Sequence, residues 1–207
     1  MPSISAPSAK KSFKTQMLQA RELAIIEAVN RLLAEKGFEA MTVDEVSAEV
    51  GIAKASLYKH FDSKEALACA AMERAMQRAQ DFIEALPPAD TALQKLKAVT
   101  RWTMQLKLLG QMPSLPSQNS SLRATLMASS TYMDGLMMVT DVLGTWIEQA
   151  QAEGQINTQL PAVAVLYTLY ARACDPVLEF LKMGNDLSDD EVLDIVMRTC
   201  FEGLQAR

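Results

Sequence analysis

Apolar residues recur three to four positions apart along most of the chain, which is the period of an α-helix with one buried face. No stretch shows the sustained alternation of apolar and polar positions that a half-buried strand requires. The pattern therefore predicts an all-α protein of about nine helices. We expect them over residues 15–36, 43–50, 54–61, 63–86, 91–109, 119–133, 135–153, 161–183 and 188–206.

Residues that satisfy or remove backbone hydrogen bonds set these boundaries. Thr42 and Glu45 have the spacing of a capping box, in which each side chain accepts from the other residue's amide. Gly51 follows a short helix, where glycine accepts a left-handed backbone. Pro87 stops the long helix 63–86, because proline has no amide hydrogen. Residues 110–120 form the one long irregular loop expected, a candidate lid or entry to an interior site.

Composition narrows the class of protein. The 207 residues are 49% hydrophobic and 22% charged, with only 8 Gly and 8 Pro, which excludes a disordered or collagen-like chain. The longest apolar stretch, Ala162–Ala171, is about half of the ~20 residues that a membrane span needs. Residues 1–9 lack the apolar core of a signal peptide. We therefore expect a cytoplasmic protein without a membrane segment.

Candidate catalytic and metal-binding groups are sparse. The three cysteines are far apart in the sequence, and His60 is the single histidine. This set does not provide the four closely spaced ligands of a structural zinc site, nor a nucleophile with its base and orienting group. We expect no catalytic residues, no metal and no cofactor, so the protein is not expected to be an enzyme.

Residues 46–61 have the pattern of a helix-turn-helix, in which a glycine corner joins two short helices that share an apolar core. An ordinary helical corner with a solvated face has the same spacing. Residues 1–64 hold nine Lys and Arg against eight Asp and Glu, so the remaining chain, with eleven against seventeen, accounts for the net charge of −5. The outer face of the second helix carries hydrogen-bond donors and no acid, which suits contact with phosphates. These donors are Lys54, Ser56, Tyr58, Lys59 and His60.

Residues 42–67 read TVDEVSAEVGIAKASLYKHFDSKEAL, and the segment 21–67 resembles the TetR family of bacterial transcriptional regulators. The resemblance implies a helix-turn-helix DNA-binding domain over 15–62, after a flexible basic tail at 1–14, and a ligand-binding and dimerisation domain over 63–207. It also implies that the recognition helix places Lys54, Ala55 and Ser56 at base edges. The phosphate contacts that it implies are Tyr58, Lys59 and His60, with Thr42 and Lys64 at two helix amino termini.

Two features of this region leave alternatives open. Ala53 stands where the family usually has a Ser or Thr cap, which we expect to cost the recognition helix ~1 kcal/mol. The tail lysines Lys10, Lys11 and Lys14 either reach an adjacent DNA groove or only improve solubility.

The carboxy-terminal helices predict a partner surface. A helix-turn-helix monomer reads few bases, so a homodimer that matches two half-sites of a double-stranded DNA operator is expected. The helices 161–183 and 188–206 are apolar around much of their circumference, which fits a four-helix interface between two copies. On the first of them we expect Arg172 to pair with Asp175, three residues on.

The middle helices are where the resemblance places a small-molecule effector. Methionine and aromatic side chains there either line an adaptable pocket or form plain core. The candidate lining residues are Trp102, Leu106, Leu122, Leu126, Tyr132, Met133, Met138 and Trp146.

Together these features predict a DNA-binding transcriptional regulator, expected to be a repressor released by a small apolar or amphipathic effector. The alternative is a ligand-independent DNA-binding adaptor that acts through a protein partner.

Overall fold

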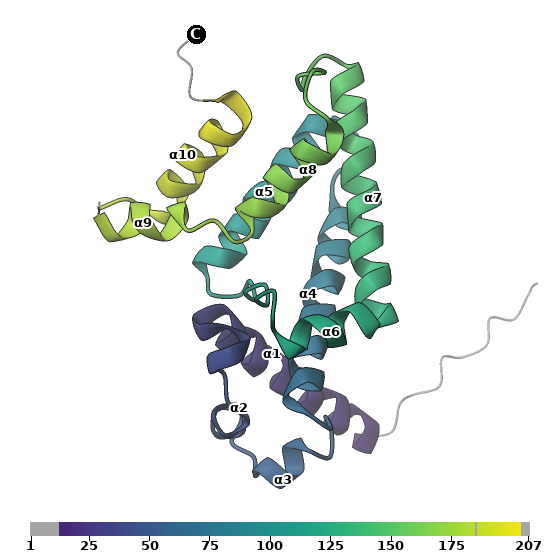
Figure 1. Ribbon diagram of the computed structural model, residues 1–207, viewed down its shortest axis with the longest axis vertical. Coiled ribbons are helices and arrows are strands. Elements are labelled where there is room, and N and C mark those ends of the chain that lie inside the picture. The colour runs from purple at the N-terminus through teal and green to yellow at the C-terminus, as the bar shows by residue number, and fades with distance from the viewer. Residues whose placement is uncertain (1–12, 185, 204–207) are drawn as a thin grey trace, which may run out of the picture.

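The computed structural model describes residues 13–184 and 186–203. Within these ranges the chain forms ten α-helices and no strand, so the all-α class is confirmed (Figure 1). The expected basic tail, with Lys10 and Lys11, lies almost wholly outside the described residues. The helices are α1 (Phe13–Ala40), α2 (Val43–Val50), α3 (Lys54–Leu57), α4 (Lys64–Ala85), α5 (Ala92–Leu108), α6 (Ser121–Ala128), α7 (Ser130–Ala152), α8 (Ala162–Arg172), α9 (Val177–Gly184) and α10 (Asp189–Glu202).

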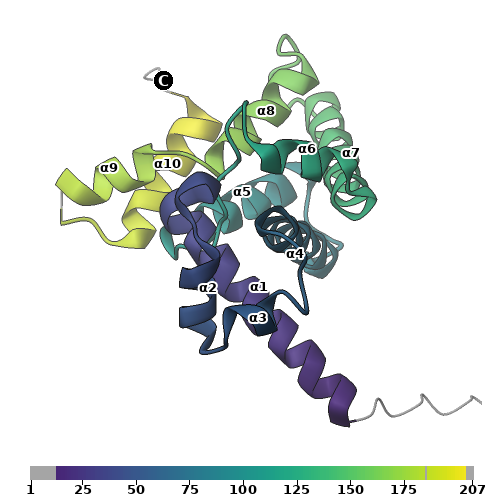
Figure 2. The same cartoon turned by 60° about the horizontal axis from the view of Figure 1, so that its bottom comes forward.

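The first three helices form a small unit at one end of the molecule (Figures 1 and 2). The capping box at the start of α2 is present, with Thr42 and Glu45 each accepting from the other's amide. Gly51 ends α2 at a φ of 72°, and the next amide, of Ile52, donates to the Ser47 carbonyl at 3.0 Å. This closure turns the chain sharply into α3, and the buried Leu57 anchors α3 on the unit's core.

Helix α4 connects this unit to the rest of the protein. It is 22 residues long, begins at the N-cap Ser63 and packs against both α1 and α7. One apolar cluster includes Ile25 and Val29 of α1, Leu67 and Met72 of α4, and Leu122 of α6. The two ends of the molecule therefore share a core, and the unit formed by α1 to α3 is fixed to the base of the larger helical layer.

The larger layer contains two further clusters. Helices α5, α7 and α8 enclose the second cluster beside the upper half of α4, and α9 and α10 pack on α5 around the third (Figure 1). Arg101 of α5 binds both Asp190 and Asp194 of α10, which fixes α10 to α5. None of the helices within 13–184 and 186–203 is long and apolar enough to cross a membrane.

Two expected boundaries in this layer are wrong. The expected helix 161–183 is interrupted between α8 and α9, because Pro176 cannot donate a backbone hydrogen bond and disfavours helical backbone at Asp175 before it. The break expected at Gly135 occurs instead at Ser129, whose hydroxyl accepts from the Tyr132 amide and caps α7. Gly135 lies inside α7.

The glycine at 135 lets α7 approach α4 closely. A Cβ atom at this position would lie 3.1 Å from the Met76 Cβ, whereas one at Gly144, in the same helix, would meet nothing within 4 Å. Side-chain size at 135 therefore sets the α4–α7 distance.

We expect Gly135→Val to lower the free energy of unfolding by about 1–3 kcal/mol, because the added atoms force two packed helices apart. Gly144→Ala is the matched substitution in open space and should raise it by roughly 0.5–1 kcal/mol through helix propensity. Urea unfolding followed by circular dichroism measures both. Equal effects at the two positions would contradict the close α4–α7 approach.

Candidate functional site

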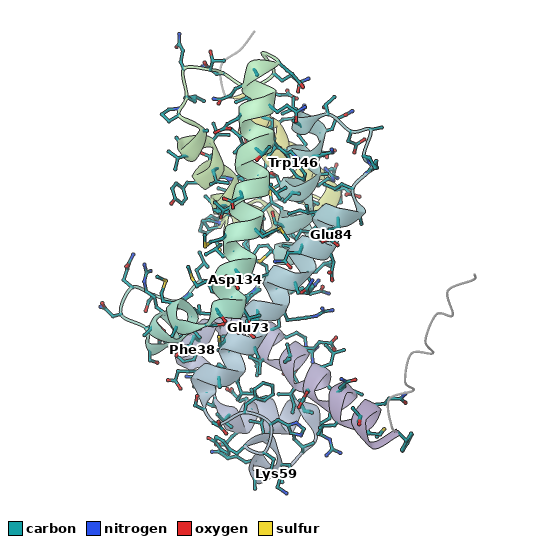
Figure 3. All side chains as sticks on the ribbon, turned by 90° about the vertical axis from the view of Figure 1, so that its right-hand side faces the viewer. Phe38, Lys59, Glu73, Glu84, Asp134 and Trp146 are labelled. Carbon is teal, nitrogen blue, oxygen red and sulfur yellow. The ribbon has the colours of Figure 1, made fainter. Side chains whose placement is uncertain are left out.

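The surface at the tip of the α2–α3 unit presents most of the expected DNA-contacting residues. Lys54, Ala55, Tyr58 and Lys59 are exposed there, and Ser56 is half-buried. Figure 3 shows Lys59 at the extremity of the molecule, at the opposite end from Trp146. The buried Leu57 holds this helix against the core, so its outer residues have a fixed orientation.

An acidic residue borders this surface. Asp44, in the first turn of α2, lies 2.9 Å from the Lys54 ammonium, and this hydrogen bond raises the pKa of Lys54. Helix α3 itself carries no acid, as expected, but the neighbouring helix supplies one that the linear pattern of α3 does not show. Lys54 would have to exchange this exposed partner for a base or a phosphate, an exchange of low cost at a solvated ion pair.

The prediction that His60 faces outward is wrong. Its side chain is 6% exposed, and its Nδ1 lies 3.3 Å from a carboxylate oxygen of Glu22 in α1. Tyr58 and Lys59 continue the turn after α3, and the chain then folds His60 inward between that turn and α1. His60 is thus a residue that positions the recognition helix.

Thr42 and Lys64 are also engaged within the chain. The amide and the hydroxyl of Thr42 both donate to Glu45, at 2.9 and 2.8 Å. The Lys64 ammonium donates to the Glu39 carbonyl and lies 4.4 Å from the centre of the Phe38 ring. The structure brings both residues to the α1–α2 and α1–α4 junctions, and their phosphate contacts stay predictions. Ala53 caps α3 without a side-chain hydrogen bond, as expected.

Glu45 joins two helices of this unit. One carboxylate oxygen lies 2.6 Å from the Lys36 ammonium of α1, and the other accepts from Thr42. The hydrogen bond from Lys36 and then those from Thr42 lower the pKa of Glu45 from 4.5 to about 2. The carboxylate form therefore holds α2 to the end of α1.

A cavity of about 110 Å³ lies in the larger layer, between α4, α5, α7 and α8. Its walls are almost wholly apolar, and the polar side chains on it come from few residues. The Tyr170 hydroxyl forms a 2.8 Å hydrogen bond with Thr140, and burial raises its pKa, so it stays a neutral group. Arg78 of α4 and Gln111 of the loop before α6 meet at 3.0 Å.

The predicted effector-binding residues divide between this cavity and the core. Trp102 and Leu106 line the cavity, and Trp102 stacks on Phe82 with ring centres 4.7 Å apart. The remaining six do not line it. Leu122, Leu126, Tyr132 and Met133 belong to the cluster that joins the two ends of the molecule, Trp146 packs in the second cluster, and Met138 is half-buried on α7.

Sequence reasoning missed Arg78 and Gln111 as lining residues. Arg78 follows Ala71 and Ala75 at helical spacing, which places a basic residue on the apolar face of the long helix. This pattern could have indicated Arg78 as a lining residue. Gln111 lies in the loop expected to act as a lid, but its direction depends on how that loop crosses α1 and α4.

A further surface, on α8 and α9, is apolar and exposed. Tyr167, Phe180 and Met183 are 66%, 68% and 83% exposed. By contrast, Val192, Leu193 and Val196 of α10 are buried against α5 and α9, so much of the apolar circumference of the last helix is used inside the chain. The expected pair between Arg172 and Asp175 is confirmed at 2.5 Å.

The comparison with family models identifies the amino-terminal part. Residues 25–71 match the model for bacterial regulatory proteins of the tetR family, and they cover the unit formed by most of α1, α2, α3 and the start of α4. The amino-terminal domain is therefore of the TetR family's DNA-binding type.

Curated relatives match the same region. The chain is 36% identical over 81 residues to YerO of Bacillus subtilis, an HTH-type transcriptional regulator, and 39% identical over 59 residues to IcaR of Staphylococcus epidermidis, a negative regulator of a biofilm operon. These segments are 36% and 28% of this chain and 28% and 32% of the relatives. The match thus spans about a third of their length.

Solved structures match nearly the whole chain in fold. The regulator of fatty acid degradation FadR from Bacillus halodurans superposes with a TM-score of 0.68 at 20% identity, over 90% of this chain and 97% of that one. AibR in complex with isovaleryl coenzyme A and operator DNA gives 0.62 at 19% identity, over 87% and 98%. FadR from Bacillus subtilis with stearoyl-CoA gives 0.63 at 18%, over 88% and 99%. The fold of these structures is therefore shared over nearly nine-tenths of this chain or more.

We expect Glu45→Gln to weaken the acid sensitivity of folding. Because the pKa of Glu45 is lowered in the folded state, its contribution to stability is present above about pH 4.5 and is lost as the pH falls toward about 2. Melting temperatures from about pH 6 to pH 2.5 should fall less steeply in this variant than in the wild type. Glu84→Gln, at an exposed site on α4, is the control, and parallel curves for all three proteins would contradict the role of Glu45.

Proposed function

We propose that this TetR-family protein is a DNA-binding transcriptional regulator that responds to a small molecule. The observation that carries the proposal is the exposed surface formed by Lys54 and Ala55 of α3 and by Tyr58 and Lys59 of the turn after it, anchored by Leu57 within the segment that matches the family. Amine and hydroxyl donors on a rigid helix suit phosphates and base edges. Lys54, Ala55 and Ser56 face the bases, and Tyr58 and Lys59 contact phosphates, with Thr42 and Lys64 at the flanks.

The cavity supports the response to a ligand. Ala75, Met76 and Ala79 of α4 line it, and the first turns of α4 pack on α1 of the DNA-binding unit. A ligand that moves α4 would therefore change the direction of the recognition helix. We propose that the protein acts as a repressor and that a small apolar or amphipathic effector releases it from DNA. The enclosed apolar space favours this reading over the ligand-independent adaptor.

The exposed face of α8 and α9 supports a homodimer as the DNA-binding form. Tyr167 of α8 and Phe180 and Met183 of α9 are exposed, and both helices lie away from the tip formed by α2 and α3 (Figure 1). A second copy on this face buries apolar side chains that are otherwise in water. It also supplies a second recognition helix for the other half-site. The interface then uses α8 and α9 more than α10.

DNA binding is tested by selecting bound sequences from a random duplex pool with the full-length protein. We expect a palindromic consensus with two half-sites. Lys59→Ala should weaken binding to all sequences and reduce the slope of log K against log salt by about 1, whereas Lys54→Ala and Ser56→Ala should change the selected bases. Arg198→Ala, which removes one positive charge from exposed α10, is the control. Unchanged affinity in all three variants at Lys54, Ser56 and Lys59 would refute the proposed surface.

The dimer is tested by Phe180→Asp. A carboxylate on the α8–α9 face should raise the dimer dissociation constant at least tenfold, because a charge would be buried without a partner. Analytical ultracentrifugation measures it. Met127→Asp alters a residue of α6 that is exposed to a similar extent, 63%, and should leave the dimer intact. Dimers of equal strength in both variants, or a monomeric wild type, would contradict this interface.

A further inference from the structure

Arg78 is the one cationic residue among those that line the apolar cavity. It lies on α4 among Met76, Ala79 and the side chains of α5, α7 and α8 that form the walls. Its guanidinium donates to the neutral Gln111 side-chain carbonyl at 3.0 Å. The ion pairs formed within residues 13–184 and 186–203 do not involve Arg78. A half-buried guanidinium bound only to an amide can gain a stronger partner from an anionic ligand.

Gln111 also contacts the DNA-binding unit. Its main-chain carbonyl accepts from the Asn30 side-chain amide of α1 at 2.8 Å, and Ser114 in the same loop donates to the Leu33 carbonyl at 3.4 Å. Gln111 thus binds the Arg78 guanidinium through its side chain and α1 through its main chain. The two hydrogen bonds of this bridge join residues 33 and 81 positions apart in the sequence, so the bridge exists only in the folded chain.

The cavity volume limits the ligand. About 110 Å³ is smaller than the roughly 150 Å³ of an engineered lysozyme cavity that binds benzene. Because that larger cavity holds one benzene ring, the apolar body that this cavity accepts is no larger than about six carbons, branched or aromatic. A long acyl chain does not fit the cavity in this form.

We propose that the cavity binds a small monocarboxylic acid whose carboxylate pairs with Arg78 in place of Gln111. The inference rests on the proposed function and names its effector class. A carboxylate accepts two parallel hydrogen bonds from a guanidinium, which a single amide oxygen cannot do. The released Gln111 loosens the loop at residues 109–120 and its hydrogen bonds to Asn30 and Leu33. The α1 unit then changes its position on α4, and DNA affinity falls.

The free acid is a better match than its coenzyme A thioester. The anionic groups of such a thioester are phosphates at the far end of the cofactor, whereas the acyl carbonyl beside the apolar body is neutral. Arg78 contributes to the cavity lining itself, so its partner must be on the small apolar body.

Binding is tested by calorimetry on the full-length protein with 3-methylbutanoate and with benzoate. The neutral amides of the same two acids have the same shape without the charge and should bind at least tenfold more weakly. Arg78→Gln should weaken acid binding at least tenfold and leave amide binding unchanged, whereas Arg74→Gln, an exposed arginine one turn earlier, should change neither. Retained amide binding shows that the Arg78→Gln cavity is folded.

Three results would overturn the ligand class. They are equal binding of acid and amide, acid binding that does not depend on Arg78, and tight binding of isovaleryl-CoA with none of either acid. None of these measurements involves DNA, so they test the ligand class separately from DNA binding. If the wild type selects no DNA sequence, the proposed function is refuted and the ligand class is not.

The bridge is tested by hydrogen exchange and by DNA binding. Acid should increase amide exchange in the second half of α1, around residues 30–36, and lower affinity for the selected DNA. In Gln111→Ala without acid, amide exchange in α1 and the affinity for DNA should already equal those of the acid-bound wild type. Adding acid should change neither of them. Gln118→Ala, an exposed position in the same loop, should behave as the wild type. Unaltered α1 exchange on acid binding, or an intact response in Gln111→Ala, would overturn the bridge.

Discussion

The packing of α4 against both α1 and α7 is the constraint on which the rest of the structure depends. Leu67 and Met72 of α4 share one apolar cluster with Val29 of α1 and Leu122 of α6. Gly135 allows α7 to approach the same helix, whose upper half forms a wall of the cavity. Because protein interiors are densely packed, a change at one end of α4 cannot be absorbed locally. A single helix therefore connects the cavity to the unit formed by α1 to α3.

Charged side chains in the unit formed by α1 to α3 have distinct roles. In a chain with a net charge of −5, lysines are exposed at the tip of the molecule, while the acids near them are used to position helices. Glu45 holds α2 to Lys36, and Glu22 holds His60 against α1. Asp44 is the exception, since it pairs with Lys54 on the outer surface. The same few carboxylates thus fix the geometry of the donors that DNA would meet.

The candidate DNA surface was largely predictable, and the cavity was not. Lys54 lies on a short helix, and Tyr58 and Lys59 lie in the turn that follows it. Gly51 and Leu57 determine the orientation of this segment locally, so spacing alone gives the exposure of these residues. His60 belongs to the same short stretch, but its direction depends on Glu22, 38 residues earlier. In the larger layer every helix has an apolar face, and periodicity cannot distinguish side chains that fill a core, such as Leu126 and Trp146, from those that border an empty space, such as Trp102.

The sequence by itself determined the helical class, the capping boxes, the turn at Gly51 and the family of the first domain, because these depend on residues within a few positions of one another. Tertiary structure decided which apolar faces meet. It placed α10 on α5, left apolar side chains of α8 and α9 exposed, and brought Arg78, Gln111 and Asn30 together from three distant segments. Such contacts depend on how whole helices pack, and a one-dimensional pattern of polar and apolar positions does not contain that information.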